Sequence, residues 1–414
     1  MGLRVNSLLL VFKMKKTVLF LTITLVIIVL IFLNGNKTEV AKQPLLYFDL
    51  YSAAQNDSTF YLSDFAKSIE YVKLDVSDSV YISDIREIDM TDEFIFILEK
   101  NFKLYKYDRN GNFIKRIGNN GEGPGEYIAP LSFALFPQKE LIAVMDYTQQ
   151  RIIIYSFSGK FIRQFKALSF SSKIANLNRK YIATITPFPE FAGNDNFGLT
   201  VYDFSGKTVS RMLNRGYETS KKGFDENTMP TEGRIFFRNI DDTLTYWEAE
   251  LDTVYKIIDK NTIIPKVALI NNRKNNSHRA GKIIENSLWI GKVTETKRYF
   301  FVTPCIFNNS IKHIILDKVT GKGYNMNINN INDKLEIEAG FINNVDGGWP
   351  VCPVRVTSGG EIVSFFYGFE LKDIINELYL NKIDIKDSQK ALQFKTIVNN
   401  AKIDDNPVLM IIKE

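Results

Sequence analysis

The sequence predicts an all-β protein: a six-bladed β-propeller of four-stranded antiparallel blades, with a short C-terminal helical insertion and an N-terminal hydrophobic helix. Three observations predict this fold: a repeated strand–turn–strand unit, short apolar runs between the repeats, and a glycine-rich connector after the first repeat. A chain of 414 residues, 45% of them hydrophobic, can form several ordinary domains or one large repeat architecture. The repeats favour the single repeat architecture.

The repeated unit is a strand, a polar turn that ends in glycine, and a second strand. Glycine suits the left-handed conformation that closes a short hairpin loop, and asparagine tolerates it. The turns recur at about 50 residues, which is the period of propeller blades. The copies lie at 104–114, 153–162, 200–209, 253–261 and 315–322, with Gly111, Gly159, Gly206, Asn261 and Gly321 at the turns. We interpret each hairpin as the outer two strands of a blade.

Shorter patterns predict the strands that complete the blades. Apolar runs at 93–98 and 141–146 are typical of strands packed between neighbouring blades. A sixth blade is inferred at 341–367, where no clear hairpin repeat occurs.

The C-terminal region is predicted to contain helices and a closing strand. Apolar spacing at 371–380 and 388–398 is helical and predicts an insertion before the last strand. The last strand, 408–412, is expected to pair with the first blade and close the ring, which removes exposed sheet edges.

The glycine-rich run after the first repeat predicts a structural turn. Pro124 and Gly125 suit the central positions of a type II turn, because proline presets φ and glycine accepts a positive φ. A phosphate-binding loop is the alternative, but a Walker loop requires lysine after its second glycine, and a dinucleotide fingerprint requires glycine in place of Glu126. We expect Glu126 and Tyr127 to tie the turn to the next blade by a hydrogen bond or ring packing. The motif comprises Gly118, Gly121, Gly123, Pro124, Gly125, Glu126 and Tyr127.

This run closely resembles the Gly-x-Gly-Pro-Gly-Glu-Tyr signature of a six-bladed β-propeller family of Bacteroidetes envelope proteins. Residues 68–74 resemble that family's opening strand and 404–412 its closing segment, so the resemblance covers nearly all of the chain after the N-terminal segment. The resemblance implies the propeller fold and a location at the cell envelope, and it implies no particular reaction. Many members carry a lipoprotein cysteine after the signal sequence. This chain has none there, so the resemblance does not imply a lipid anchor.

Residues 1–42 are predicted to form a signal peptide or an N-terminal membrane anchor with a linker, and residues 43–414 the propeller. The run Thr17–Leu33 is apolar or threonine over 17 residues, at the lower limit for spanning a bilayer. Four basic residues precede this run, which places the N-terminus in the cytoplasm and exports the body. No pair of small residues marks a cleavage site after Leu33, which favours an uncleaved anchor over a cleaved signal peptide.

The predicted location is the cell envelope. The propeller is expected on the periplasmic side of a membrane anchor, or secreted to the periplasm if the signal is cleaved. Met14, followed by Lys15 and Lys16, resembles a translation start more closely than Met1 does. We therefore interpret the first thirteen residues as an upstream extension.

The net positive charge of the chain comes entirely from this N-terminal segment. The formal net charge is +5, and the first 42 residues contain six basic residues and one acidic residue. The rest of the chain therefore holds equal numbers of acidic and basic residues. A neutral body lacks the basic surface on which nucleic-acid binding relies, so we do not expect a nucleic-acid partner.

The chain offers few residues for catalysis or metal binding. Its two histidines, His278 and His313, cannot supply the several histidines that metal-dependent propeller enzymes need. The sequence contains no nucleophile-elbow motif and no calcium loop. Cys305 and Cys352 form either one disulfide or two separate thiols. We therefore assign no catalytic, cofactor-binding or metal-binding residue.

A glycan-active enzyme remains an alternative, because two carboxylates across the mouth of the channel would be enough for a glycosidase. The acidic candidates are Asp84, Glu87, Asp146, Glu190 and Asp195. Tryptophans can stack on sugar rings, although packing between blades is their commoner role. The three tryptophans are Trp247, Trp289 and Trp349.

These observations favour a non-enzymatic module over an enzyme. We expect an exported, envelope-associated propeller that uses its channel mouth or its loops to bind a peptide, a glycan or a partner protein. The alternative is an envelope hydrolase or lyase that acts on glycans through paired carboxylates. A third interpretation is a purely structural part of an envelope complex. The N-terminal helix adds the membrane as a partner, and no cofactor is expected.

Overall fold

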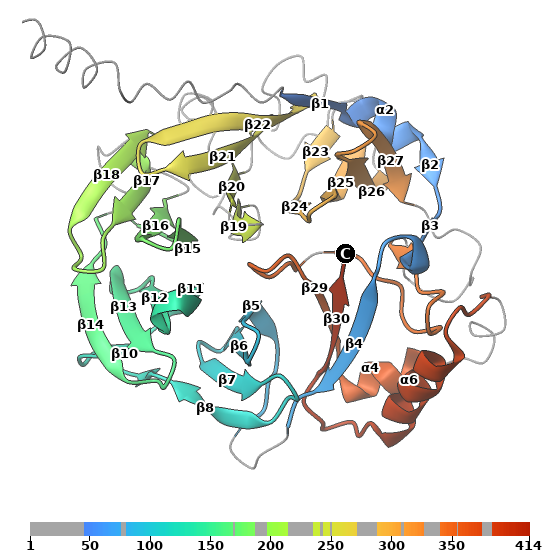
Figure 1. Cartoon of the computed structure of the whole chain (residues 1–414), viewed down its shortest axis with the longest axis horizontal. Coiled ribbons are helices and arrows are strands. Elements are labelled where there is room, and N and C mark those ends of the chain that lie inside the picture. The colour runs from blue at the N-terminus through green and yellow to red at the C-terminus, as the bar shows by residue number, and fades with distance from the viewer. Residues whose placement is uncertain are drawn as a thin grey trace, which may run out of the picture. The chain divides into compact units, whose positions relative to one another are not determined.

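The computed structural model is a six-bladed β-propeller with its blades arranged around a central axis (Figure 1). Each blade is an antiparallel sheet whose innermost strand lies nearest the axis. The prediction of an all-β propeller with few helices is therefore confirmed. The structure describes residues 45–75, 80–168, 170–186, 197–213, 235–240, 243–248, 251–270, 288–307, 310–326, 340–353, 355–374 and 383–414.

The first three blades are four-stranded sheets built from consecutive strands. Blade 1 contains β5 (Ile85–Met90), β6 (Phe94–Glu99), β7 (Leu104–Asp108) and β8 (Phe113–Ile117). Blade 2 contains β11 (Pro130–Phe136), β12 (Leu141–Asp146), β13 (Arg151–Ser156) and β14 (Phe161–Lys166). Blade 3 contains β15 (Lys173–Leu177), β16 (Tyr181–Ile185), β17 (Phe197–Tyr202) and β18 (Thr208–Leu213).

Blades 4 and 5 follow the same order with small variations. Blade 4 contains β19 (Ile235–Ile240), β20 (Thr243–Glu248), β21 (Thr253–Asp259) and β22 (Thr262–Ile270). The innermost strand of blade 5 is divided into β23 (Leu288–Ile290) and β24 (Val293–Glu295), and both parts pair with β25 (Tyr299–Phe307). β26 (Ser310–Asp317) and β27 (Lys322–Met326) complete its sheet.

The five predicted hairpins are the third and fourth strands of blades 1 to 5, as expected. The four turn glycines have φ values between +69° and +92°, the left-handed region that glycine adopts without a steric penalty. The apolar runs at 93–98 and 141–146 correspond to β6 and β12, which are buried along nearly their whole length. Burial on both faces of a blade explains why these runs are continuous rather than alternating.

The sixth blade joins the two ends of the described chain. Its sheet has the order β29 (Ile362–Phe366), β30 (Val408–Lys413), β4 (Ser68–Lys73), and a bridge from Val356 to Ile362 adds an innermost segment. β30 thus pairs with β4, which precedes blade 1 in the chain, and not with a strand of blade 1 itself. The apolar run of β30 is buried on both sides, which requires two neighbouring strands but does not identify them.

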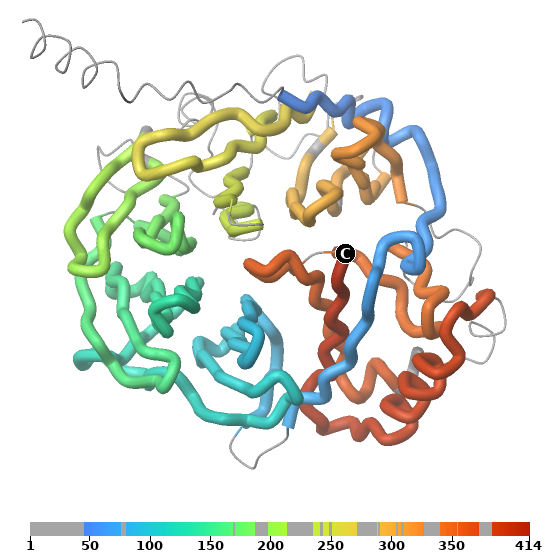
Figure 2. The backbone as a smooth tube through the Cα atoms, viewed as in Figure 1, coloured from blue at the N-terminus to red at the C-terminus, as the bar shows by residue number. Residues whose placement is uncertain are grey.

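An N-terminal strap, defined here as residues 46–61, crosses the outer edges of blades 4 and 5. β1 (Leu46–Asp49) pairs in parallel with β22, and α2 (Leu50–Gln55) packs on β26 and β27. β2 (Asp57–Ser58) then extends β27, and β3 (Phe60–Tyr61) pairs with β28 (Phe341–Ile342) before the chain enters β4. Figure 2 shows this blue segment running along the rim. The strap therefore supplies partners for edge strands that would otherwise be open.

The helix α2 fits against blade 5 because Gly323 leaves room for it. A Cβ atom at Gly323 would lie 2.7 Å from the Cβ of Ala53 and 2.9 Å from a methyl carbon of Leu316. The Asp49 carboxylate caps the helix by accepting a hydrogen bond from the Ser52 N–H at 3.0 Å. The absence of a side chain at one position of β27 thus fixes the course of the strap.

The predicted helical insertion lies between β29 and β30. It contains α4 (Gly368–Ile374) and α6 (Ser388–Asn400), while residues 375–382 lie outside the described part of the chain. The Asp387 carboxylate caps α6 by accepting hydrogen bonds from the N–H groups of Gln389 and Lys390. The prediction of helices before the last strand is confirmed.

No helix in the described ranges combines the length and hydropathy that a membrane crossing requires. The predicted N-terminal segment 1–42, with its run Thr17–Leu33 and the alternative start Met14, lies outside those ranges.

The antiparallel strand order gives the propeller two different faces. Each innermost strand ends at the face that also carries the turn between the third and fourth strands, and we call this the hairpin face. The opposite face carries the segments that lead from one blade to the next, such as 118–129, and we call it the connector face. Side chains near the carboxyl ends of the innermost strands therefore gather at the hairpin face.

We expect Gly323→Val to destabilise the protein by about 1–3 kcal/mol, because overpacking would force α2 away from blade 5. Lys322→Val is the matched control, since Lys322 is an exposed residue of the same strand. Equilibrium unfolding in guanidinium chloride measures both variants. Equal stabilities would show that α2 does not depend on the space at Gly323.

Candidate binding pocket at the propeller axis

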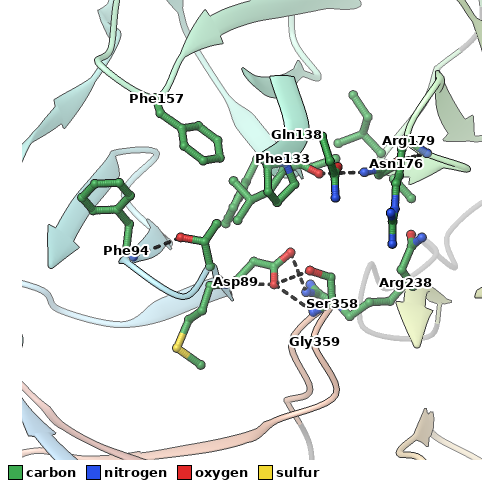
Figure 3. A pocket seen from close by; sticks show the side chains of 18 of the residues that line it. Asp89, Phe94, Phe133, Gln138, Phe157, Asn176, Arg179, Arg238, Ser358 and Gly359 are labelled. Carbon is green, nitrogen blue, oxygen red and sulfur yellow. Dashed lines mark hydrogen bonds and ion pairs between the residues drawn. The ribbon is translucent and has the colours of Figure 1, made fainter. Parts of the chain in front are cut away.

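A pocket opens at the hairpin face, on the propeller axis. Its volume is about 440 Å³, and its walls come from the innermost strands β5, β11, β15 and β19 and from the loop at Ser358 in blade 6 (Figure 3). Because five blades contribute, no single repeat contains the site. The pocket belongs to the assembled ring.

The floor of the pocket is an ion pair network centred on Arg238 of β19. Glu87 and Asp89 alternate along β5, so both side chains leave the strand on the same side. Arg238 Nη2 lies 2.6 Å from Glu87 Oε1, and Arg238 Nη1 lies 3.7 Å from Asp89 Oδ2. Lys173, the first residue of β15, places its Nζ 3.8 Å from Glu87 Oε2. One guanidinium from blade 4 thus forms ion pairs with two carboxylates from blade 1.

Asp89 is held by blade 6 as well as by blade 4. Its Oδ1 accepts hydrogen bonds from the Ser358 N–H at 2.8 Å, the Ser358 hydroxyl at 2.9 Å and the Met90 N–H at 2.9 Å. Figure 3 shows Ser358 and Arg238 both directed at this carboxylate. Burial raises the pKa of Asp89, while the charge of Arg238 and these hydrogen bonds oppose that rise. The carboxylate is therefore fixed in position by partners within the protein.

The walls of the pocket are largely aromatic and aliphatic. Phe133 of β11, Phe237 of β19 and Phe157 line it and are almost completely buried. Phe94 also lines it, and Lys106 Nζ lies 3.3 Å from the centroid of its ring and donates to the Phe157 carbonyl at 3.1 Å. This cation–π contact occupies one face of the Phe94 ring.

The rim of the pocket is polar and open to solvent. Its exposed polar residues are Asp92, Glu93, Gln138, Glu140 and Arg179. Apolar walls above a fixed polar floor, with hydrogen-bonding groups at the rim, are the usual composition of a ligand pocket. The arrangement suits binding of an extended ligand whose end enters the axis.

The five acidic candidates from the sequence separate in the structure. Only Glu87 of the described candidates lines the pocket. Asp84 forms an ion pair with Lys100. Asp146 is buried and accepts hydrogen bonds from the N–H groups of Ile128 and Ala129 at 3.2 and 3.1 Å, so it has a structural role in the connector. Two candidates, Glu190 and Asp195, lie outside the described residues.

Sequence reasoning missed Asp89, Arg238 and Ser358. The spacing of Glu87 and Asp89 on a predicted innermost strand was a usable signal, because alternate residues of a strand share one face. Arg238 had no such signal, since its partner Glu87 lies 151 residues earlier in the chain. Only the closed ring brings these blades together.

The tryptophans do not line this pocket in the described structure. Trp247 is fully buried and donates its indole N–H to the Leu251 carbonyl at 2.9 Å, which confirms the packing interpretation for this residue. Trp349 is half-buried against Phe366, with ring centroids 6.4 Å apart. The side chain of Trp289 lies outside the described part.

The histidines and cysteines form no part of the pocket lining in the described residues. The ring of His313 bonds to the Thr303 hydroxyl, and His278 lies outside the described ranges. Cys305 and Cys352 are both thiols rather than a disulfide. Burial raises the pKa of Cys305 to about 12 and also raises that of Cys352. Both thiols are therefore protonated near neutral pH.

The glycine-rich motif lies on the connector face, opposite the pocket. Pro124 and Gly125 occupy the centre of a turn in which the Glu126 N–H donates to the Gly123 carbonyl at 3.1 Å. Gly125 has φ +76°, the value that the third position of a type II turn requires. The Glu126 carboxylate folds back to accept the Gly123 N–H at 3.0 Å. Gly118 and Gly121 also have positive φ, at +68° and +154°.

Hydrogen bonds connect this turn to blades 1 and 2. The Tyr127 hydroxyl donates to the Ile117 carbonyl at 2.7 Å, at the end of β8. From blade 2, the Tyr155 hydroxyl donates to the Gly125 carbonyl at 2.9 Å, and Arg151 Nη2 donates to the Glu126 carbonyl at 2.6 Å. We therefore propose that the motif is a structural connector between two blades.

We expect Gly125→Val to destabilise the protein by roughly 2–4 kcal/mol, from left-handed backbone strain and from overpacking. A Cβ atom there would lie 2.7 Å from the ring of Phe161. Asn119→Val, at an exposed position of the same connector, is the control. Thermal unfolding measures both, and an unchanged melting temperature for Gly125→Val would contradict the structural role of the turn.

Three solved structures match this chain at low sequence identity. A Bacteroides fragilis protein provisionally classed as exported is 20% identical with a TM-score of 0.61, covering 89% of this chain and 100% of that chain. A member of the DUF4221 family from Bacteroides vulgatus is 12% identical with a TM-score of 0.38, covering 63% of this chain and 86% of that chain. BamB from Moraxella catarrhalis is 14% identical with a TM-score of 0.37, covering 61% and 66%. The first of these likenesses supports the fold alone.

The comparison with protein families is more specific. No curated protein matches the sequence. The model of a domain of unknown function, DUF4934, matches residues 45–413. That range runs from the start of the strap to the last residue of β30, and so includes every blade and the pocket. The chain belongs to the DUF4934 family.

Proposed function

We propose that this protein is an exported, envelope-associated propeller that binds a peptide, a glycan or a partner protein in the pocket at its axis. The observation that carries the proposal is the fixed floor of the pocket, where Arg238 lies between Glu87 and Asp89. A floor whose charges are already compensated stays in place when a ligand arrives. Rigid polar groups below apolar walls provide preorganised recognition.

The same network argues for binding rather than for acid–base catalysis. A general acid or base must reach the substrate and exchange a proton with it. Glu87 and Asp89 share one guanidinium, and Asp89 also accepts two hydrogen bonds from Ser358. These contacts direct both carboxylates toward groups of the protein itself rather than toward a substrate.

The cellular setting of the proposal comes from the predicted N-terminal segment. Residues 1–42 would anchor the chain in the membrane or direct its export, and residues 43–414 would present the propeller at the cell envelope. The similar Bacteroides fragilis protein is itself classed, provisionally, as exported. In this arrangement the pocket would meet ligands outside the cytoplasm.

One observation favours a second candidate function, a glycan-active hydrolase or lyase. Glu87 and Asp89 are two carboxylates in one pocket, and residues two apart on a strand are separated by about 6–7 Å. That spacing falls within the range used by glycosidases, about 5–10 Å. The two acids lie on one strand, however, and not on opposite sides of a substrate path.

Ligand binding to the full-length chain tests the first proposal. Glycan and peptide arrays identify a ligand, and titration calorimetry then measures its affinity. Gln138→Ala and Arg179→Ala, both at the exposed rim, should each weaken binding by about fivefold, equivalent to roughly 1 kcal/mol. Lys166→Ala is the control, because Lys166 is exposed at the end of β14 and does not line the pocket. Unchanged affinity in both rim variants would place the ligand elsewhere.

Hydrolysis of a polysaccharide panel tests the second candidate. If the enzyme interpretation holds, Glu87→Gln and Asp89→Asn should each abolish product release in protein that still unfolds in one cooperative thermal transition, although at a lower temperature because a buried ion pair is lost. Asp84→Asn, which changes an acid outside the pocket lining, should keep full activity. A chain that binds a glycan and releases no product would exclude this candidate for that glycan.

A further inference from the structure

Two neighbouring turns give the mouth of the pocket three exposed acids, which we call the rim carboxylates. Asp92 and Glu93 lie in the turn between β5 and β6 of blade 1, and Glu140 lies in the turn between β11 and β12 of blade 2. All three line the pocket and are exposed. Their side chains form no hydrogen bond or ion pair with any residue that the structure describes. The rim carboxylates thus differ from the acids of the floor, which Arg238 and Lys173 compensate.

Packing between blades 1 and 2 holds these two turns side by side. The ring of Phe94, the residue after Glu93, lies with its centroid 6.5 Å from that of Phe157, at an interplanar angle of 87°. The Phe157 N–H donates to the Glu140 carbonyl at 2.7 Å, and the Glu140 N–H donates to the Pro137 carbonyl at 3.0 Å. The backbone of both turns is therefore fixed, while the rim carboxylates remain open to solvent.

One buried cation lies beneath the two turns. Lys106 of β7 is almost completely buried, and its Nζ donates to the Phe157 carbonyl at 3.1 Å. Burial lowers the pKa of Lys106, and the negative charges of Glu93 and Glu140 oppose that fall. A single lysine that is bonded to a carbonyl cannot compensate three carboxylates.

The other cations near these turns have partners of their own or lie on another blade. Lys139 places its Nζ 5.3 Å from the ring centroid of Phe204, and Arg109 Nη2 lies 3.5 Å from Glu70 Oε2. Arg179 lines the rim from the turn between β15 and β16 of blade 3. The described mouth is therefore acidic over blades 1 and 2, and its positive charge lies over blade 3.

The walls below this mouth suit aliphatic chains better than sugar rings. Sugars stack on the open faces of aromatic side chains. The rings of Phe133, Phe157 and Phe237 are almost completely buried, and Lys106 occupies one face of Phe94. Lysine and arginine side chains combine an aliphatic stem with a charged head. Apolar walls beneath an acidic mouth match both parts of such a side chain.

We propose that the pocket binds a basic peptide segment, in which lysine or arginine residues flank an apolar residue. The inference rests on the proposed binding function and selects peptide from its ligand classes. The apolar side chain lies against Phe133, Leu135 and Ile174, which line the walls. The basic heads meet the rim carboxylates, and their stems follow the walls. Gln138 and Arg179, across the mouth, provide N–H donors for the peptide carbonyl groups.

Three synthetic peptides with blocked ends test this ligand class on the full-length chain. They share a central phenylalanine and differ only in flanking residues, which are lysine, glutamine or glutamate. Surface plasmon resonance with the immobilised chain measures affinity and association rate. At low salt the lysine peptide should bind about fivefold more tightly than the glutamine peptide, and the glutamate peptide most weakly. In about 1 M sodium chloride the difference should fall below about twofold, because salt screens exposed charges.

Variants of the rim assign this preference to its residues. Glu93→Gln and Glu140→Gln should each reduce the preference for the lysine peptide about twofold, mainly through slower association. Their affinity for the glutamine peptide should stay unchanged, because exposed rim residues do not shape the walls. Glu122→Gln is the matched control, since Glu122 is an exposed acid of the connector face and loses the same charge.

Four results would overturn the inference. They are no binding of any peptide, equal binding of all three, tighter binding of the glutamine or glutamate peptide, or a lysine preference that both rim variants leave intact. A glycan whose binding depends on Gln138 and Arg179 would also exclude a basic peptide, yet it would leave the proposed binding function standing. That function itself fails only if no ligand depends on those two residues.

Discussion

Closure of the ring is the constraint on which the rest of this structure depends. A propeller made from one open chain must join its last blade to its first, and here six residue pairs between β30 and β4 do so, from Val408–Lys73 to Lys413–Ser68. β4 comes from the N-terminal part of the chain and β30 from the C-terminus. The sheet of blade 6 is complete only when these two segments pair. The strap then adds contacts at the edges of blades 4 and 5.

The pocket and the closure are coupled through the seam between blades 6 and 1. The hydrogen bonds from Ser358 to Asp89 cross this seam, and so does the bond from Arg355 to the Ile85 carbonyl. Arg238 adds blade 4 to the same network. A change in the closing strands would therefore alter the floor of the pocket as well as the stability of the ring. The floor of the pocket and the closed ring share the same few polar contacts.

The local parts of the fold were predictable from the sequence, and the long-range parts were not. The hairpins at Gly111, Gly159, Gly206 and Gly321 follow from turn chemistry that acts within a few residues. The partner strand of β30 could not be predicted in this way, because an apolar sequence indicates only that both sides of the strand are covered. The contacts in the floor of the pocket were the least predictable, since Ser358 and Asp89 are 269 residues apart in the chain. Charge compensation across blades has no periodic signature in a single sequence.

The strap also determines how the molecule would respond to a mechanical load. If the segment before Leu46 tethers the chain, tension enters at β1, where four residue pairs join it in parallel to β22 at the rim. Parallel strands of this kind resist a pull along their length in shear, so the rim takes the force first. The next elements in line are α2, seated over Gly323, and the short strands β2 and β3; β4 follows them. A tether at this end would therefore load the seam that closes the ring, while the innermost strands around the axis stand away from the line of force.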